Sequence, residues 1–319
     1  MSITVCLVLY SIAIAVIGPP VLVRLTDRGI APHLGVAAWC AAIAGVVLAW
    51  FGSVVTLVAE FAPSWNQPAR WVVDCFTGLV DGADGVSGAA LRILLVVLSV
   101  SAVLAFSAAA WRTGRGLLRM RARTHRHARM ARIIGQRLAG FDAVILDAPA
   151  RAAYCVAGRP HTIVITSGAL AALDRRQLGA VLAHERAHLS GRHHQLLALV
   201  RGLAASLPGV RLFSVGAVEI ARLLEMCADD TAARTHGSSA LLGGLLSLAG
   251  APPAPAGTLA ATGVDVLTRA SRLAAPPSLS THVRTGALLS TAIAVIALGP
   301  AMFGLLSAAG VIMCGPMGI

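Results

Sequence analysis

Long uncharged apolar segments constrain this chain more than any other feature of its sequence. A helix of about 20 apolar residues is long enough to cross a bilayer. Four segments approach or exceed that length without a charged side chain, at residues 1–23, 34–59, 93–110 and 285–313. Only 13% of the chain is charged, about half of what a soluble domain carries. We therefore expect an α-helical multi-pass membrane protein with about four spans.

Arginine is distributed unevenly between the loops that join these spans. The segment 112–137 contains nine arginines and no acid, whereas the loop near 60–92 holds four acidic residues against two arginines. Loops rich in basic residues stay in the cytoplasm. The sequence thus predicts a plasma-membrane protein with residues 24–33 and 112–284 in the cytoplasm and both termini outside.

The net charge of +12 comes from arginine alone, because the chain contains no lysine. A basic surface fits contact with anionic lipid. We expect no direct nucleic-acid binding, since no recognition motif or aromatic platform is present. The six cysteines include no CxxC pair, which argues against a disulfide framework or a thiolate metal site.

Three regions follow from this topology. Residues 1–111 form a membrane region with three spans, 112–284 a cytoplasmic domain, and 285–319 the fourth span with a short outer tail. Pro19 and Pro20 predict a kink or a stop near the end of the first span.

The cytoplasmic domain has a mixed helical and strand pattern. Its start, 112–139, resembles a basic helix on the membrane surface. Short β-rich runs at 143–147, 152–157 and 162–166 predict strands. Asp174 is placed to cap a helix over 175–190, so the domain reads as α+β.

The predicted helix contains an HExxH motif, His184-Glu185-Arg186-Ala187-His188. A spacing of four residues places both imidazoles on one helix face, where they can bind one metal ion. Glu185 lies beside that face and can accept a proton from water. An incidental pair of histidines on a solvated helix is the alternative.

A second helix supplies a candidate third ligand in the run Leu224-Glu225-Met226-Cys227-Ala228-Asp229. Glu225 would complete a His₂Glu set with one open position, as in catalytic zinc sites. Asp229, one turn later, can hold a ligand histidine by its other ring nitrogen. Glu219 is a rival ligand that lacks an aspartate four residues on. The strand TIVIT at 162–166 occupies the sequence position expected of a substrate-binding edge strand.

The run ITSGALAALDRRQLGAVLAHERAHLSGRHH, followed by EMCAD, resembles the membrane gluzincins. These include HtpX-type and CAAX-prenyl-protease-type peptidases, whose pattern is HExxH followed by ExxxD. Placement of the motif between a third and a fourth span is more similar to the BlaR/MecR-type antirepressor peptidases. The strong resemblance covers roughly residues 140–235.

The resemblance implies a zincin-like fold and one Zn²⁺ per chain. It implies His184, His188 and Glu225 as ligands, Glu185 as the catalytic base, and Asp229 as the partner of a ligand. Arg234 and His236 are weaker candidates for the oxyanion donor that such peptidases need. His193 and His194 are expected to form a polar helix end rather than to bind metal.

The resemblance also suggests a function, a metalloendopeptidase that cleaves a cytoplasmic protein or itself. A winged-helix repressor is the partner expected of an antirepressor. A homodimer is one possible oligomeric state, which the sequence does not decide. The absence of lysine excludes the Ser-x-x-Lys acylation used by penicillin-binding sensor domains. Quality control of membrane proteins, as in HtpX-type peptidases, is the alternative enzymatic role. A nonenzymatic sensor with structural zinc is the third hypothesis.

Residues 196–220 are apolar enough to suggest a fifth span. One crossing there would separate Glu225 from His184 by the bilayer, so no shared metal site could form. Pro208-Gly209 interrupts the segment, and we therefore predict two helices.

Overall fold

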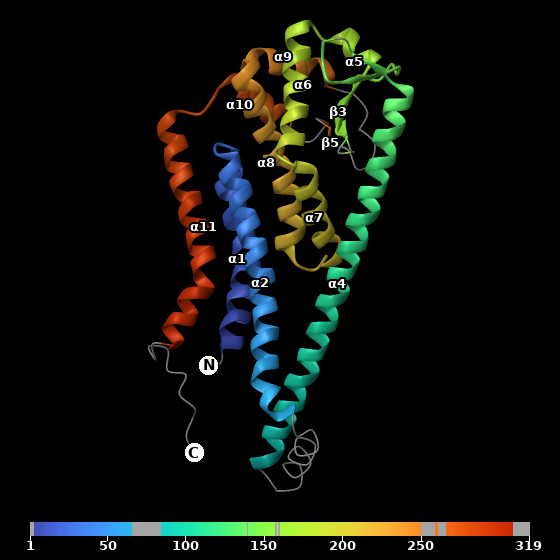
Figure 1. The fold of residues 1–319 in the computed structure, drawn as a ribbon. Coiled ribbons are helices and arrows are strands. Elements are labelled where there is room, and N and C mark those ends of the chain that lie inside the picture. Colours follow the sequence, from blue (N-terminus) through green and yellow to red (C-terminus); the bar gives the residue numbers. More distant parts are fainter. Residues whose placement is uncertain are drawn as a thin grey trace. The chain divides into compact units, whose positions relative to one another are not determined.

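The computed structural model describes residues 3–65, 84–249 except 139, 157 and 159, then 259–260 and 266–308. The described chain is mostly helical (Figure 1). It divides into two compact units, which are taken separately below. The first comprises Met1–Gly18, Cys40–Arg112 and Ile293–Ile319, and the second comprises Pro19–Trp39 and Thr113–Ala292.

Three helices are long and apolar enough to cross a membrane. The candidate spans are Cys6–Thr26 in α1 (Ile3–Thr26), Pro32–Thr56 in α2 (Pro32–Trp65) and Leu279–Pro300 in α11 (Leu279–Ala308). A helix suits this role because it satisfies its backbone polar groups internally. The predicted span at 93–110 is not among these three candidates in the described part of the chain, so the expected count of about four spans remains a prediction.

Polar side chains link the apolar helices of the first unit. Tyr10 of α1 donates a hydrogen bond to the backbone carbonyl of Ile296 in α11, at 2.6 Å. Trp50 of α2 donates through its indole nitrogen to the Ser11 hydroxyl, at 3.1 Å. These bonds give buried polar groups their partners, as a dry interior requires.

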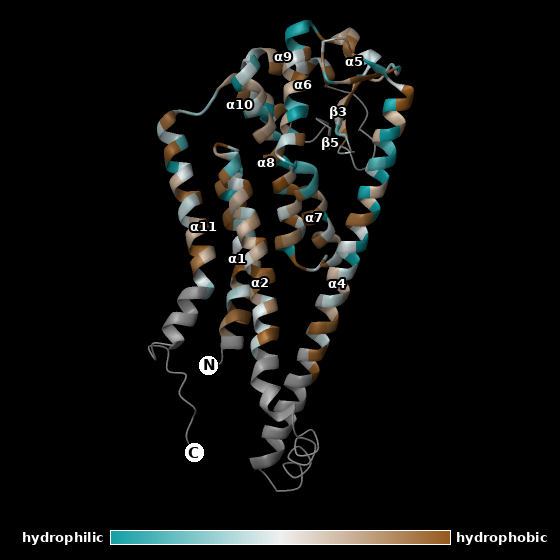
Figure 2. Cartoon of the chain, viewed as in Figure 1, coloured by the Kyte–Doolittle hydropathy of each residue, from teal (hydrophilic) through white to brown (hydrophobic). Residues whose placement is uncertain are grey.

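Two helices are longer than the sequence suggested. α1 runs through Pro19 and Pro20 to Thr26, so no helix stop lies there; apolar helices tolerate proline when neighbouring groups satisfy the freed carbonyls. α4 (Asp84–Ile134) is continuous and joins the predicted third span to the arginine-rich segment. Figure 2 shows α4 changing from hydrophobic to hydrophilic along its length.

A small five-stranded sheet belongs to the second unit. Its strands are β1 (Gln136–Arg137), β2 (Val144–Leu146), β3 (Ala153–Val156), β4 (Thr162–Thr166) and β5 (Leu259–Ala260), in the order β1-β2-β4-β3-β5. β4 pairs in parallel with β2 and antiparallel with β3.

The position of β4 corrects one expectation from the sequence. The strand TIVIT is hydrogen-bonded on both sides and is not an edge strand. Every residue of β4 is buried, which explains its unbroken β-branched run, because an interior strand covered on both faces does not alternate apolar with polar residues.

Helices complete the second unit. They are α5 (Ser167–Ala172), α6 (Arg175–Ser190), α7 (His193–Ser206), α8 (Arg211–His236), α9 (Ser238–Leu248) and α10 (Val266–Ala274). The segment 196–220 is divided between α7 and α8, with Pro208-Gly209 between them, as the sequence indicated.

Two apolar clusters hold this unit together. One joins the end of α4 to the sheet through Ala128, Ala131, Tyr154, Val156 and Val164. The other joins α6, α8, α9 and α10 through Ala180, Ala232, Leu241, Leu245 and Leu273. The second cluster sets α6 and α8 side by side, which brings the two halves of the predicted site together.

Candidate metal centre

Helix α6 presents the HExxH histidines on its buried face. Asp174 accepts hydrogen bonds from the amides of Arg176 and Gln177, and the Asp174 amide donates one to the Gln177 side-chain oxygen, which completes a capping box. This cap sets where the helix begins and therefore which face turns inward. His184 and His188 are 2% and 1% exposed.

Three potential ligand atoms converge between α6 and α8. The Nε2 atoms of His184 and His188 lie 3.1 Å apart. The Glu225 carboxylate of α8 lies 3.4 Å from each of them, through Oε2 to His184 and Oε1 to His188. Among the described residues, these three side chains form the group that could hold a metal ion.

The remaining ring nitrogen of His184 faces Asp229. Asp229 is fully buried on α8, one turn after Glu225, and its Oδ1 lies 3.0 Å from His184 Nδ1. A carboxylate at this position fixes the ring orientation and leaves Nε2 free to face the cluster. Burial alone would lower the pKa of His184, but Asp229 and Glu225 outweigh it and raise the pKa to about 9.

His188 has a corresponding partner in His193, whose involvement the sequence did not reveal. His193 is the first residue of α7, is buried, and places its Nδ1 2.9 Å from His188 Nδ1. Gly191 makes this possible, because a Cβ there would lie 2.4 Å from His193 Nε2. His193 is therefore an oriented neighbour of the cluster rather than a solvated helix end.

Arg269 is the second residue that sequence reasoning missed. It lies on α10, is 2% exposed, and donates two hydrogen bonds of 2.7 Å to the Asp229 carboxylate. Its Nη1 also lies 3.1 Å from Glu225 Oε2. Burial would raise the pKa of Asp229, but Arg269 and His184 outweigh it and hold the pKa at about 2. In the sequence, Arg269 was one of many arginines in the predicted cytoplasmic segment 112–284, and no local pattern marked it.

Glu185 lies on α6 between the two histidines and is 1% exposed. Its Oε2 has no hydrogen-bond partner among the described residues, and the Cys155 thiol of β3 hydrogen-bonds the carboxylate. Burial raises the pKa of Glu185, although the two imidazoles act in the opposite direction. A desolvated carboxylate with a raised pKa is a better proton acceptor than one in water.

The donor set fits a divalent cation in two respects. Ligand atoms about 2.0–2.1 Å from a tetrahedral zinc ion lie roughly 3.3 Å from each other. The two Nε2 atoms lie 3.1 Å apart, and each lies 3.4 Å from one of the two Glu225 oxygens. Charge gives the second argument. Metal binding replaces the proton that the raised pKa of His184 retains, so both imidazoles are then neutral. In that state the carboxylates of Glu185, Glu225 and Asp229 meet one guanidinium, which leaves two negative charges for the cation to compensate. Uncompensated buried charge is costly, and one Zn²⁺ would neutralise it.

The weaker candidates lie elsewhere. Arg234 and His236 are exposed in the last turns of α8, about 13 and 16 Å beyond Glu225 along the helix axis. Arg234 donates to Thr231. Glu219 forms an ion pair with Arg222 at 2.8 Å. The structure therefore brings none of these three side chains into the histidine cluster.

One comparison with known proteins matches the part of the chain that carries the two histidines. Residues 118–221 match the sequence model of Peptidase family M48. The matched third of the chain includes both histidines and Glu185 and ends before Glu225. It indicates a metallopeptidase of a zinc-dependent family. No curated protein and no solved structure gave a significant match.

Proposed function

We propose that this chain is a membrane zinc metalloendopeptidase, with His184, His188 and Glu225 as the metal ligands and Glu185 as the catalytic base. The observation that carries the proposal is the convergence of the two Nε2 atoms, 3.1 Å apart, with the Glu225 carboxylate, which has one oxygen 3.4 Å from each of them. The M48 match and the apolar helices fit a membrane metallopeptidase.

Each residue has a separate task in this mechanism. Zinc bound here would supply Lewis acidity, which lowers the pKa of water from 15.7 to about 7. Glu185 accepts the proton from the attacking water and returns it to the leaving amine. Asp229 and His193 keep the two imidazoles turned toward the cluster. The buried surroundings strengthen each electrostatic interaction.

Metal analysis tests the ligand assignment. The purified full-length protein should hold about one zinc per chain, and a His184→Ala/His188→Ala double variant should lose most of it. His282→Ala is the matched control, because His282 is exposed at the start of α11. Undiminished zinc in the double variant would refute the site.

Peptidase assays test the base separately from the metal. Glu185→Gln should keep zinc, because Glu185 is not among the three ligands, and should lose cleavage. Cleavage by this variant with unchanged kinetics would show that another group takes the proton.

For the physiological role, we favour regulatory proteolysis of a cytoplasmic repressor or of the peptidase itself. A regulated peptidase needs a route by which a signal reaches the site.

The turn between α1 and α2 offers such a route, because it is hydrogen-bonded to the helices that carry the site. Arg222 of α8 donates to the carbonyls of Thr26 and Asp27, at 2.6 and 2.9 Å. Arg272 of α10 donates to the carbonyl of Gly29, at 2.9 Å. Movement of the first two apolar helices would therefore act on the helices that hold Glu225 and Arg269.

Substrate trapping separates this role from its alternatives. The Glu185→Gln variant, expressed in the native membrane and crosslinked, should retain its substrate. Recovery of a winged-helix repressor would support the regulatory role. Recovery of varied membrane proteins would instead support quality control. If the zinc-loaded wild-type protein cleaves none of the recovered proteins, the result would favour a nonenzymatic sensor.

A further inference from the structure

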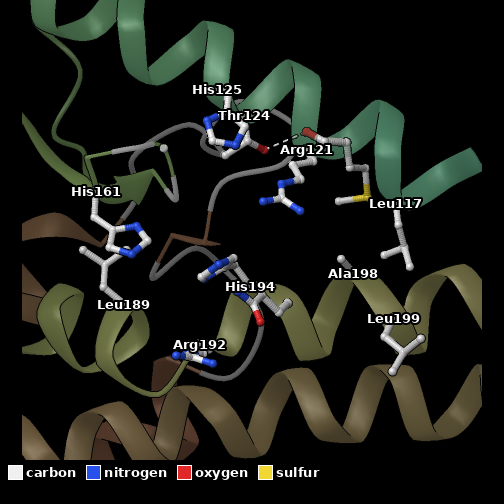
Figure 3. Close-up of a pocket in the computed structure, with 13 residues that line it drawn as sticks. Leu117, Arg121, Thr124, His125, His161, Leu189, Arg192, His194, Ala198 and Leu199 are labelled. Atoms are coloured by element: carbon white, nitrogen blue, oxygen red, sulfur yellow. Dashed lines mark hydrogen bonds between the residues drawn. The ribbon is translucent and has the colours of Figure 1, made fainter. Parts of the chain in front are cut away.

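A cavity in the same unit as the metal centre lies against α7. It measures about 630 Å³, within the range of small-molecule sites. Its walls come from α4, from the β3–β4 turn and from the junction of α6 with α7 (Figure 3). Arg132 of α4 donates to the carbonyl of Pro160, at 3.0 Å, and so holds that turn against the helix.

The cavity is lined by basic side chains without a compensating acid. They come from all three walls and are Arg121, His125, His161, Arg192 and His194. No aspartate or glutamate is among the lining residues. Among the described residues, no carboxylate forms a salt bridge with either arginine. Two guanidinium groups that face one space without an acid attract an anion, and the imidazoles can add hydrogen bonds to it.

The start of α7 adds to this field. α7 begins at His193, and no side chain caps its N-terminal amides. Arg192, the preceding residue, adopts a left-handed conformation with φ of 52°. The His194 ring lies beside His161, with ring centroids 6.2 Å apart, and His194 Nδ1 is buried without a hydrogen-bond partner. An uncapped helix N-terminus favours negative charge.

The opposite end of the cavity is apolar. Leu117, Ala198 and Leu199 lie together there, away from His161 and Arg192 (Figure 3). Leu117 is also the lining residue of α4 nearest along the helix to the apolar segment 93–110. The space therefore has a basic end and an apolar end.

We propose that this cavity binds the phosphate headgroup of an anionic phospholipid, with the first carbons of the acyl chains against Leu117 and Leu199. Arginine recognises phosphate through paired, charge-assisted hydrogen bonds. A free phosphate shares the headgroup's chemistry but has no apolar group that could contact the apolar end. The site is distinct from the metal centre and does not depend on peptidase activity.

Lipid binding to the full-length protein in dodecyl maltoside tests the proposal by native mass spectrometry. The probes are dioctanoyl phosphatidylglycerol, dioctanoylglycerol without the phosphate, and inorganic phosphate. Arg121→Gln combined with Arg192→Gln should weaken binding of the phospholipid by roughly tenfold or more, because it removes two charge-assisted contacts. Arg123→Gln combined with Arg126→Gln is the control, since both are exposed on α4 outside the cavity.

A second variant, Ala198→Trp, fills the apolar end without a change of charge. It should weaken the phospholipid and leave inorganic phosphate unaffected. Equal binding of dioctanoylglycerol would overturn the phosphate site, and inorganic phosphate binding as tightly as the phospholipid would overturn the lipid assignment. An equal loss in the control variant would reduce the effect to general surface charge and would also overturn the proposal.

Discussion

Replacing Arg269 by methionine should destabilise the metal-free protein strongly. The substitution keeps most of the side-chain length but removes the guanidinium that contacts Asp229 twice at 2.7 Å and Glu225 at 3.1 Å. Asp229 is fully buried, so its charge would lose its main partner without gaining water.

Removing one member of a buried ion pair costs about 3–5 kcal/mol in free energy of unfolding. A domain of this size loses about 2–4 °C of melting temperature per kcal/mol, so the expected fall is roughly 6–20 °C. Arg272 provides a matched control on the same helix. Its partner Asp230 is 27% exposed, whereas Asp229 is fully buried. Water can therefore solvate the Asp230 carboxylate after Arg272 is removed, and the loss of stability should be smaller.

The assay is thermal unfolding of the full-length protein in detergent, with and without zinc. Arg269→Met should melt far below Arg272→Met when the metal is removed. Zinc should recover more stability in Arg269→Met than in wild type, because the cation compensates the unpaired carboxylate charge. Arg269→Met combined with Asp229→Asn should regain part of the loss. Equal melting of the Arg269 and Arg272 variants would refute the reasoning.

Three further predictions concern His193, the pKa of Asp229 and the membrane topology. Gly191→Ala should displace the His193 ring and weaken zinc affinity by about 10–100-fold, measured by competition with a chelator; unchanged affinity would contradict the role given to His193. Because the pKa of Asp229 is depressed to about 2, its contribution of about 2 kcal/mol should be complete above pH 4 and disappear as pH falls through 2. Comparing the unfolding of wild type and Asp229→Asn between pH 2 and 6 checks this, and parallel pH profiles would rule it out. A reporter active only in the cytoplasm should work when fused after residue 140 and fail after residue 75; the opposite pattern would place the site outside and exclude a cytoplasmic substrate.

Local sequence patterns predicted part of the fold and three residues of the candidate site. The helix bearing His184 and His188 could be placed because its start is marked by Asp174 and its period sets both imidazoles on one face. Apolar segments of sufficient length likewise identified α1, α2 and α11 as candidate spans. Glu225 could be named as a third ligand from its spacing to Asp229, and the structure places it beside the histidines.

Only the tertiary structure decided which distant groups meet these residues. Arg269 follows Asp229 by 40 residues, and no local pattern pairs a single arginine with one carboxylate among several. His193 was visible as a residue, but the turn at Gly191 that aims its ring at His188 was not. The prediction that β4 is an edge strand was wrong. The residues of a strand indicate whether its two faces are buried, but they do not indicate which strands pair with its two edges. Helix and strand periods are encoded within a few residues, whereas buried ion pairs and strand order depend on how whole elements pack.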